Sequence, residues 1–62
     1  MEIIIERWIE PGGGTDYLWS VWQGGRRLQM GGRFDSAAAA EEAARDFCRE
    51  SLGRDPERVR HL

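Results

Sequence analysis

The sequence predicts a small α+β domain with a three-stranded antiparallel sheet followed by one helix, in the order β-β-β-α, with the helix packed on one face of the sheet. Two aromatic or β-branched stretches, residues 17–23 and 26–31, flank Gly24-Gly25, a dipeptide typical of a tight hairpin turn. An isoleucine-rich stretch precedes them and an alanine-rich stretch follows. With 62 residues, the chain forms a single domain, residues 1–62, with a thin margin of stability.

The first strand is predicted over residues 2–10, where isoleucines partly alternate with charged residues. Pro11 and three consecutive glycines end it with a flexible connection, and the hairpin of residues 17–31 follows. If Gly24 and Gly25 form the whole loop, the antiparallel register follows by counting outward from it. The predicted pairs are Gln23 with Arg26, Trp22 with Arg27, Val21 with Leu28, Ser20 with Gln29 and Trp19 with Met30.

Side chains of a strand alternate between the two faces of a sheet, so this register sorts the residues into two sets. We expect the face that meets the helix to carry Tyr17, Trp19, Val21, Leu28 and Met30. The opposite face then carries Leu18, Ser20, Trp22, Arg27 and Gln29. On the first strand, the same alternation places Ile3, Ile5 and Ile9 on the helix face and Ile4 and Trp8 on the opposite face.

The helix lies within residues 34–53, where the alanine run has the highest helix propensity. Asp35 or Ser36 caps its start, and Gly53 is placed to end it. The predicted inner stripe consists of Ala40, Ala44, Phe47, Cys48 and Leu52. Small alanines let the helix approach the sheet closely, and Trp19 is the residue expected to fill the space against them.

For the tail, residues 54–62, the alternatives are a short helical turn that begins at Asp55-Pro56 and a loosely ordered segment, and we favour the turn. His61, close to the end of the chain, is therefore expected to be too free for a fixed reaction geometry.

One helix covers only one face of a sheet, so the opposite face is expected to meet solvent or a partner. That face would carry Trp8, Leu18 and Trp22, with Arg27 in cation–π range of Trp22. Such an apolar patch is larger than a soluble monomer usually exposes. We therefore predict that these four residues contact a partner protein, and a homodimer through the same face is an alternative.

Little in the sequence indicates catalysis or metal binding. One cysteine and one histidine fall short of a four-ligand zinc set, and Cys48 lies on the apolar helical stripe. The glycine clusters lack the spacing of phosphate-binding loops. We expect no enzyme activity, no cofactor and no metal. The N-terminal apolar run is too short for a signal peptide or a membrane span, and a lone cysteine fits a cytoplasmic protein.

Charge divides the chain into a basic hairpin and an acidic helix, although the net charge is −2. Residues 17–34 contain three arginines, Arg26, Arg27 and Arg33. The helix carries four acids that we expect to form an acidic partner-binding surface: Glu41, Glu42, Asp46 and Glu50. A negative net charge argues against binding to nucleic acid, for which a basic domain is usual.

The hairpin nevertheless resembles part of the integrase N-terminal and AP2-type DNA-binding domains. The matching residues are Y17-x-W19-x-V21, G24-G25-R26-R27 and G32-x-F34-x-S36-x-x-x-A40. That resemblance implies a sheet that enters the major groove of DNA, with Arg26, Arg27, Arg33 and Trp22 as the contacts. The negative net charge and the absence of lysine from the sheet depart from the family pattern, so this is our second hypothesis.

In size, acidity and lack of catalytic motifs, the chain is similar to the small single-domain inhibitors that phages and mobile elements encode against bacterial defence, including anti-CRISPR proteins. No sequence motif carries this resemblance. It implies stoichiometric binding to a larger protein or nucleoprotein complex. Our leading hypothesis is therefore a non-catalytic protein-binding module of the inhibitor type.

Overall fold

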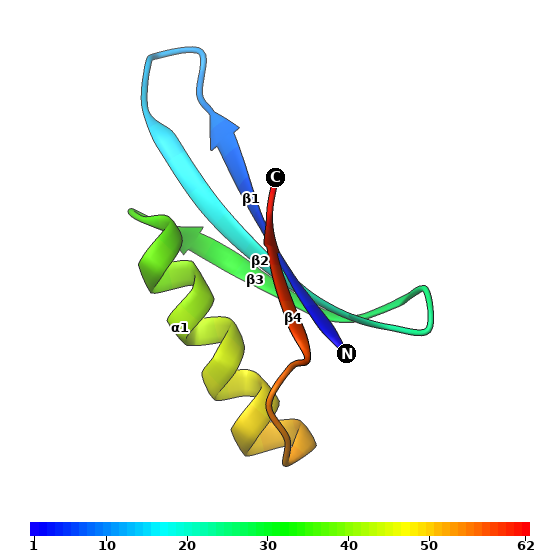
Figure 1. Cartoon of the computed structure of the whole chain (residues 1–62). Helices are drawn as coiled ribbons and strands as arrows, with labels where there is room; N and C mark the ends of the chain where they lie inside the picture. The colour runs from blue at the N-terminus through cyan, green and yellow to red at the C-terminus, as the bar shows by residue number, and fades with distance from the viewer.

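The computed structural model describes all 62 residues and consists of a four-stranded mixed sheet with one helix on one face (Figure 1). The strands are β1 (Glu2–Ile9), β2 (Thr15–Gln23), β3 (Arg26–Phe34) and β4 (Arg58–His61), in the spatial order β3-β2-β1-β4. The helix α1 (Ala37–Phe47) continues into a single π-helical segment, η1 (Cys48–Leu52). The predicted class, three strands and helix are confirmed, and the fourth strand is an addition.

The strand β4 corrects the prediction of a helical turn in the tail. It pairs in parallel with β1, from Glu2 opposite Arg58 to Ile5 opposite His61. Residues 58–62 alternate around the β-branched Val59, whose side chain packs against the core. The free edge of β1 satisfies the backbone groups of this short segment, which no local propensity favours as a strand.

The two hairpins follow their turn residues. Gly24 and Gly25 have φ angles of 58° and 79°, the left-handed values that a type I′ turn requires at both central positions. Between β1 and β2, the chain reverses over residues 10–14, where the Glu10 amide donates to the Gly14 carbonyl and the Gly13 amide donates to the Glu10 carbonyl. This connection is therefore a hydrogen-bonded turn and not a loose loop.

The predicted register of β2 and β3 holds only next to the turn. Gln23 pairs with Arg26 and Trp22 with Arg27, but an irregularity then shifts the strands by one residue, so Val21 faces Gln29. A β-bulge of this kind places one unpaired residue in a strand, here Leu28, and exchanges the faces of the residues that follow. The exchange extends to a second irregularity, between the pairs Trp19–Gly31 and Tyr17–Phe34. Met30 therefore lies opposite Ser20, away from the helix, and Gln29 lies on the helix side.

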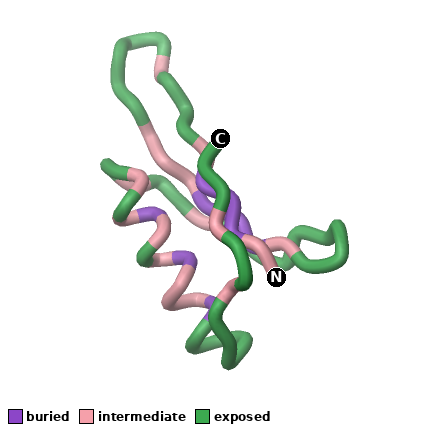
Figure 2. The backbone as a smooth tube through the Cα atoms, viewed as in Figure 1, coloured by how far each residue is buried: buried purple, intermediate pink, exposed green.

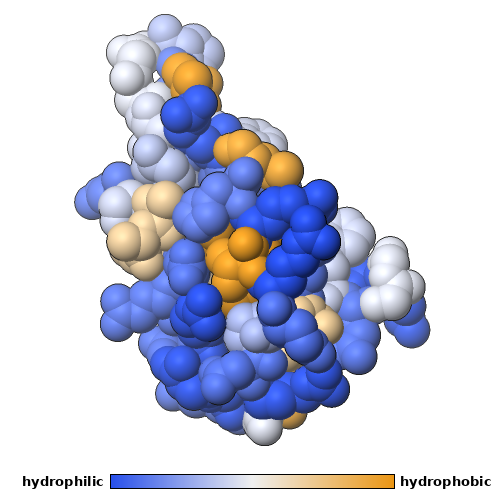
Figure 3. Space-filling view, in the orientation of Figure 1, coloured by the Kyte–Doolittle hydropathy of each residue, from blue (hydrophilic) through white to orange (hydrophobic).

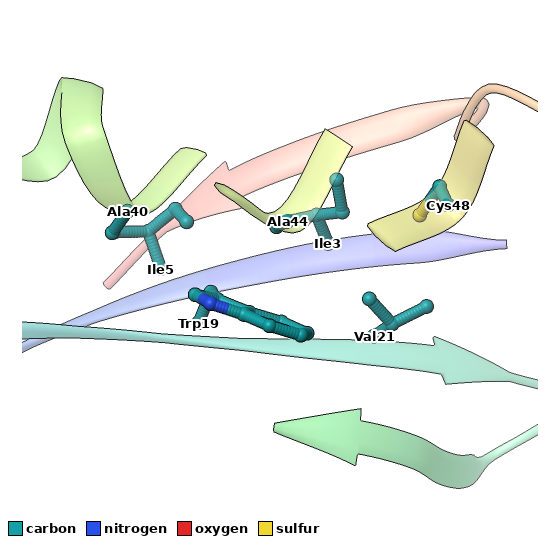
Figure 4. Packing of buried hydrophobic residues seen from close by; sticks show 7 residues of the cluster. All are labelled: Ile3, Ile5, Trp19, Val21, Ala40, Ala44 and Cys48. Atoms are coloured by element: carbon teal, nitrogen blue, oxygen red, sulfur yellow. The ribbon is translucent and has the colours of Figure 1, made fainter. Parts of the chain in front are cut away.

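The core lies between the middle of the sheet and the inner side of α1 (Figures 2 and 4). Its buried cluster consists of Ile3, Ile5, Trp19, Val21, Ala40, Ala44 and Cys48. The Trp19 ring also packs against Phe47, with ring centroids 5.5 Å apart and planes tilted by 35°. The predicted role of Trp19 and the inner stripe through Ala40, Ala44 and Cys48 are confirmed.

Three residues of the sheet that were predicted to be buried are exposed: Ile9 at 70%, Met30 at 47% and Leu28 at 41%. The bulge accounts for Leu28 and Met30. Ile9 lies near the tip of the β1–β2 hairpin, which extends beyond the helix (Figure 1). Eleven helical residues span about 16 Å and nine strand residues about 30 Å, so α1 covers only the middle of β2.

The helix ends are those expected from the sequence, with one exception. Ser36 caps α1 through its hydroxyl, which accepts from the Ala39 amide at 3.1 Å. Gly53 ends the helical segment with φ of 70°, and its amide donates to the Cys48 carbonyl. Leu52, predicted to continue the inner stripe, is 37% exposed, because the wider π-helical turn changes the direction of the last residues.

Two adjacent glycines in β3 are covered by side chains of β2, one on each face. A Cβ atom at Gly31 would lie 2.6 Å from the Trp19 ring, and one at Gly32 would lie 2.9 Å from Cγ of Leu18. A glycine pair at this point of a strand predicts a bulge or the end of the strand. The structure has the irregularity, since Trp19 pairs with Gly31 but Tyr17 pairs with Phe34, and β3 continues beyond it to Phe34. Gly31 thus makes room for the central aromatic residue of the core.

Replacing either glycine with alanine tests this packing. Gly31→Ala should destabilise the fold by about 1–3 kcal/mol, because the Trp19 ring is held by Phe47 and the alanines and cannot retreat. Gly32→Ala should cost less, because Leu18 lies on the uncovered face and can change rotamer. Urea denaturation of both variants measures the difference, and an equal loss in the two would show that Trp19 is not fixed.

Candidate functional site

The face of the sheet turned away from α1, called the open face below, is the largest surface without a covering element. Alternation and the observed register assign to it these residues of the four strands: Glu2, Ile4, Glu6, Trp8, Asp16, Leu18, Ser20, Trp22, Arg27, Met30, Arg58 and Arg60. The predicted placement of Trp8, Leu18, Trp22 and Arg27 on this face agrees with the register. Met30 joins them because of the bulge.

Exposure varies along the open face. Trp8 is 56% and Met30 47% exposed, whereas Leu18 and Trp22 are half-buried. Ile4 and Ser20 form the closed floor between them, at 9% and 5% exposure. In the middle of the face, four apolar residues therefore surround Ser20: Ile4, Leu18, Trp22 and Met30. Trp8 lies further along β1, opposite Asp16.

Both tryptophans of this face are oriented by hydrogen bonds along their own strands. The indole Nε1–H of Trp22 donates to Oγ of Ser20 at 2.8 Å, and that of Trp8 donates to Oε2 of Glu6 at 3.2 Å. Trp22 forms no cation–π contact with Arg27, although the two residues are opposite each other as predicted. Because the N–H group of each indole is already hydrogen-bonded, the two rings present apolar surface.

Only some of the charged residues on the open face form ion pairs. Asp16 lies 3.5 Å from Nε of Arg33 at one end. At the other end, Glu2 lies 3.3 Å from Nε of Arg58 and 3.6 Å from Nε of Arg60. Arg27 has no ion pair. The β4 arginines were not predicted as site residues, because the tail was not expected to join the sheet; the alternation of residues 58–62 was the available signal.

The acidic residues of the helix lie on the other side of the molecule. Glu41 binds Nε of Arg45 at 3.0 Å and Nε2 of His61 at 3.2 Å, and Asp46 binds Arg49. Glu42 has no partner within the chain, and neither does Glu50. The predicted partner-binding set is therefore divided between two sides of the domain, and half of its acids are engaged internally.

Figure 3 shows the side that carries β4 and α1. It is largely hydrophilic, and its hydrophobic residues form separate patches between charged ones. This distribution differs from that of the open face, where four apolar residues surround Ser20. The helix side is a solvated surface held by internal ion pairs.

The three arginines of the DNA-binding hypothesis are not brought together. Arg26 and Arg27 begin β3 beside the turn, whereas Arg33 lies near its opposite end, where it meets Asp16. Side chains this far apart along one strand do not form a compact basic patch.

The two residues with nucleophilic or general-base chemistry are also separated from the open face. Cys48 is fully buried in the core, and burial raises the pKa of its thiol. His61 is held in β4 and bound to Glu41, which corrects the prediction that it is free. No group of three or more histidine, cysteine, aspartate or glutamate side chains is arranged to hold a metal ion.

No protein-family model, curated protein or solved structure matches this chain. Neither α1 nor η1 has the length and apolar character that a membrane-crossing helix needs.

Replacing Trp19 or Trp22 with alanine tests which face of the sheet each residue occupies. Trp19→Ala should cost about 3–5 kcal/mol and leave the domain largely unfolded, because it empties the centre of the core. Trp22→Ala should cost about 1–2 kcal/mol, for a half-buried ring and one hydrogen bond, and should retain the fold. Thermal unfolding followed by circular dichroism compares them; similar melting temperatures would contradict the assignment of faces.

The contacts of Glu41 with Arg45 on the same helix and with His61 of β4 should make stability depend on pH. The Arg45 hydrogen bond, with a further contribution from His61, lowers the pKa of Glu41 below its ordinary value of 4.5. A depressed pKa stabilises the fold above about pH 4.5, and this stabilisation is lost as the pH falls through the lower folded value. Glu41→Gln should therefore be less stable than wild type at neutral pH, and the difference should shrink in acid.

Urea denaturation at a series of pH values between neutrality and strong acid measures this difference. Glu42→Gln is the matched control, because its carboxylate has no partner and is one residue away. A Glu41→Gln deficit that is the same at every pH would mean that Glu41 acts through packing and not through its charge.

Proposed function

We propose that this protein is a non-catalytic module that binds another protein through its open face. The observation that carries the proposal is the uncovered apolar layer of the open face. In it, exposed Met30 lies near half-buried Leu18 and Trp22, and exposed Trp8 lies further along β1. The helix stabilises the domain from the opposite side. The two tasks, folding and binding, are thereby assigned to different faces of one sheet.

The size and composition of the layer support a protein partner. A tryptophan side chain buries about 150–250 Å² when it is covered, and binding energy in interfaces concentrates in such aromatic anchors near the centre. Two tryptophans with Leu18 and Met30 can form the centre of an interface that covers roughly 800 Å² on one partner. Arg27, Arg33 and the β4 arginines supply the polar rim that surrounds such a centre.

The mode of action that we propose is inhibition by stoichiometric binding to a larger protein or nucleoprotein complex, as in the phage inhibitors that the chain resembles. The buried thiol of Cys48 and the engaged imidazole of His61 support action by occupancy and not by chemistry. Occupancy requires only that the open face reach its target.

Site-specific photocrosslinking in cells of the source organism tests the proposal. A photoreactive phenylalanine analogue is placed at Trp8, at Met30 and, as the control on the helix side, at Glu42. We expect one discrete heterologous adduct from the first two positions and none from the control, because only the open face contacts the partner. Trp8→Glu should abolish capture of the same protein and leave the melting temperature nearly unchanged.

Three results would contradict the proposal. An adduct that forms mainly from Glu42 would move binding to the helix side. An adduct with the mass of two copies of this chain, together with a dimer in light scattering, would show that the open face serves self-association. Capture that persists in Trp8→Glu would show that the tryptophan is not an anchor.

A further inference from the structure

A hollow of about 370 Å³ opens on one end of the open face, between the β2–β3 turn and β4. Ile4 forms its floor, Trp22 one wall, and Glu2 and Arg60 the opposite side. The turn glycines Gly24 and Gly25 line the entrance, and no atom lies within 4 Å of where their Cβ atoms would be. The volume falls within the range of about 300–1,000 Å³ that is typical of small binding pockets.

The hollow has an apolar part, formed by Met1, Ile4 and Trp22, within a lining whose other residues are polar or glycine. Ile4, from the central strand β1, is 9% exposed and closes the bottom of the hollow. The Trp22 indole N–H is already bonded to Ser20, so its ring offers a face and an edge without an unsatisfied donor. A bulky apolar or aromatic side chain matches this lining better than a polar one.

One arginine, Arg60, lines the hollow, and two more with unused hydrogen-bonding capacity lie near it. Arg58 is beside Glu2, and Arg27 is on the other side of Trp22. Arg58 and Arg60 approach one oxygen of Glu2 through Nε, and neither guanidinium makes a hydrogen bond within the chain. Arg27, opposite Trp22, has no charged partner at all. Three guanidinium groups against one carboxylate leave this end of the face with a surplus of two positive charges, on a chain whose net charge is −2.

We propose that the hollow binds an acidic segment of the partner protein, with one large apolar side chain inserted between Ile4 and Trp22. The carboxylates that flank this side chain pair with Arg60, Arg58 and Arg27. Guanidinium groups bind carboxylates in a bidentate geometry, and the free Nη atoms of the two β4 arginines provide it. The inference rests on the proposed function, since it names the chemistry of the partner at one part of the open face.

The charges of the rest of the face favour a peptide over a nucleic-acid strand. Glu6 and Asp16 lie along the same face beyond the hollow, and Glu2 stands at its rim. A strand of nucleic acid would carry its regular row of phosphates past these carboxylates, and like charges would repel. A short acidic segment places its carboxylates only at the arginine-rich end.

A blocked five-residue peptide, with phenylalanine between two pairs of glutamates, is the probe. Titration into the ¹⁵N-labelled full chain should shift the indole N–H signal of Trp22 and the amides of Ile4 and Arg60, and leave those of α1 in place. A peptide with lysines in place of the glutamates should not bind. A peptide with alanine in place of the phenylalanine should bind more weakly, because the apolar contact is lost.

The double variant Arg58→Gln and Arg60→Gln should weaken peptide binding by roughly tenfold or more, because charge-assisted hydrogen bonds are lost. Arg7→Gln is the matched control, since Arg7 is another exposed arginine without a partner but lies on the helix face of β1. The single variant Arg60→Gln keeps the Arg58–Glu2 pair and serves if the double variant unfolds. Equal weakening by Arg7→Gln would reduce the effect to net charge and overturn the assignment.

Two further outcomes would overturn the inference: no shift at Trp22 with millimolar peptide, or tighter binding of a single-stranded oligonucleotide at the same signals. Each is separable from the proposed function. If Trp8 and Met30 crosslink to a partner while the peptide leaves Trp22 unaffected, the open face binds protein and the hollow has another role. If the peptide binds but Trp8→Glu still captures the partner, the hollow is a binding site for acidic segments and Trp8 is not part of the interface.

Discussion

The packing of Trp19 against both the helix and β3 is the interaction on which the rest of the structure depends. Its indole lies under the alanines of α1, meets Phe47 and occupies the space that a side chain at Gly31 would need. One ring thus joins the helix to two strands. In so small a domain, where the surface buried on folding is limited, a large central side chain is an effective way to connect a helix of small residues to a sheet.

The same packing fixes which surfaces are left uncovered. Because α1 is shorter than the strands and is centred on Trp19, both hairpins extend past it, and Ile9 and Trp8 near the β1–β2 turn are exposed. After η1, the chain returns to the edge of the sheet opposite β3, where β4 pairs with β1. Val59 closes the core on the helix side, while Arg58 and Arg60 pass to the open face. A single short strand therefore completes the core and also supplies the arginines of the hollow.

Much of the fold is predictable from the sequence because local signals and the global arrangement agree. Gly24-Gly25, Ser36 and Gly53 each mark a boundary by their backbone preferences, and the structure places a turn or a helix end at each. The bulge at Leu28 was not predictable by counting, since the count assumes one residue opposite one residue. The reason for the shift is visible only in three dimensions: it brings Gly31, and not Met30, opposite Trp19.

The same distinction applies to the candidate site: local patterns predict some of its residues, and long-range strand pairing places the others. Trp8, Leu18 and Trp22 were assignable to one face because alternation near a well-defined turn is a local property. The arginines of β4 were not, because their position depends on pairing between residues more than fifty apart in the chain. The acidic helix illustrates the converse error. Its charges were correctly placed at the surface with Arg45 and Arg49 between them, but the contact of Glu41 with His61 of β4 was not predicted.

The separation of the two faces has a consequence for how such a protein can change. Substitutions toward the helix alter a core in which Ile3, Val21, Ala40 and Ala44 have no exposed surface, so they act first on stability. Exposed positions of the open face, such as Trp8 and Met30, are free of that constraint. The floor formed by Ile4 and Ser20 lies between these limits, since it belongs to the central strands and also lines the open face. A binding surface built over such a floor can exchange its outer residues for a new partner, while the central strands and the packing of Trp19 keep the framework unchanged.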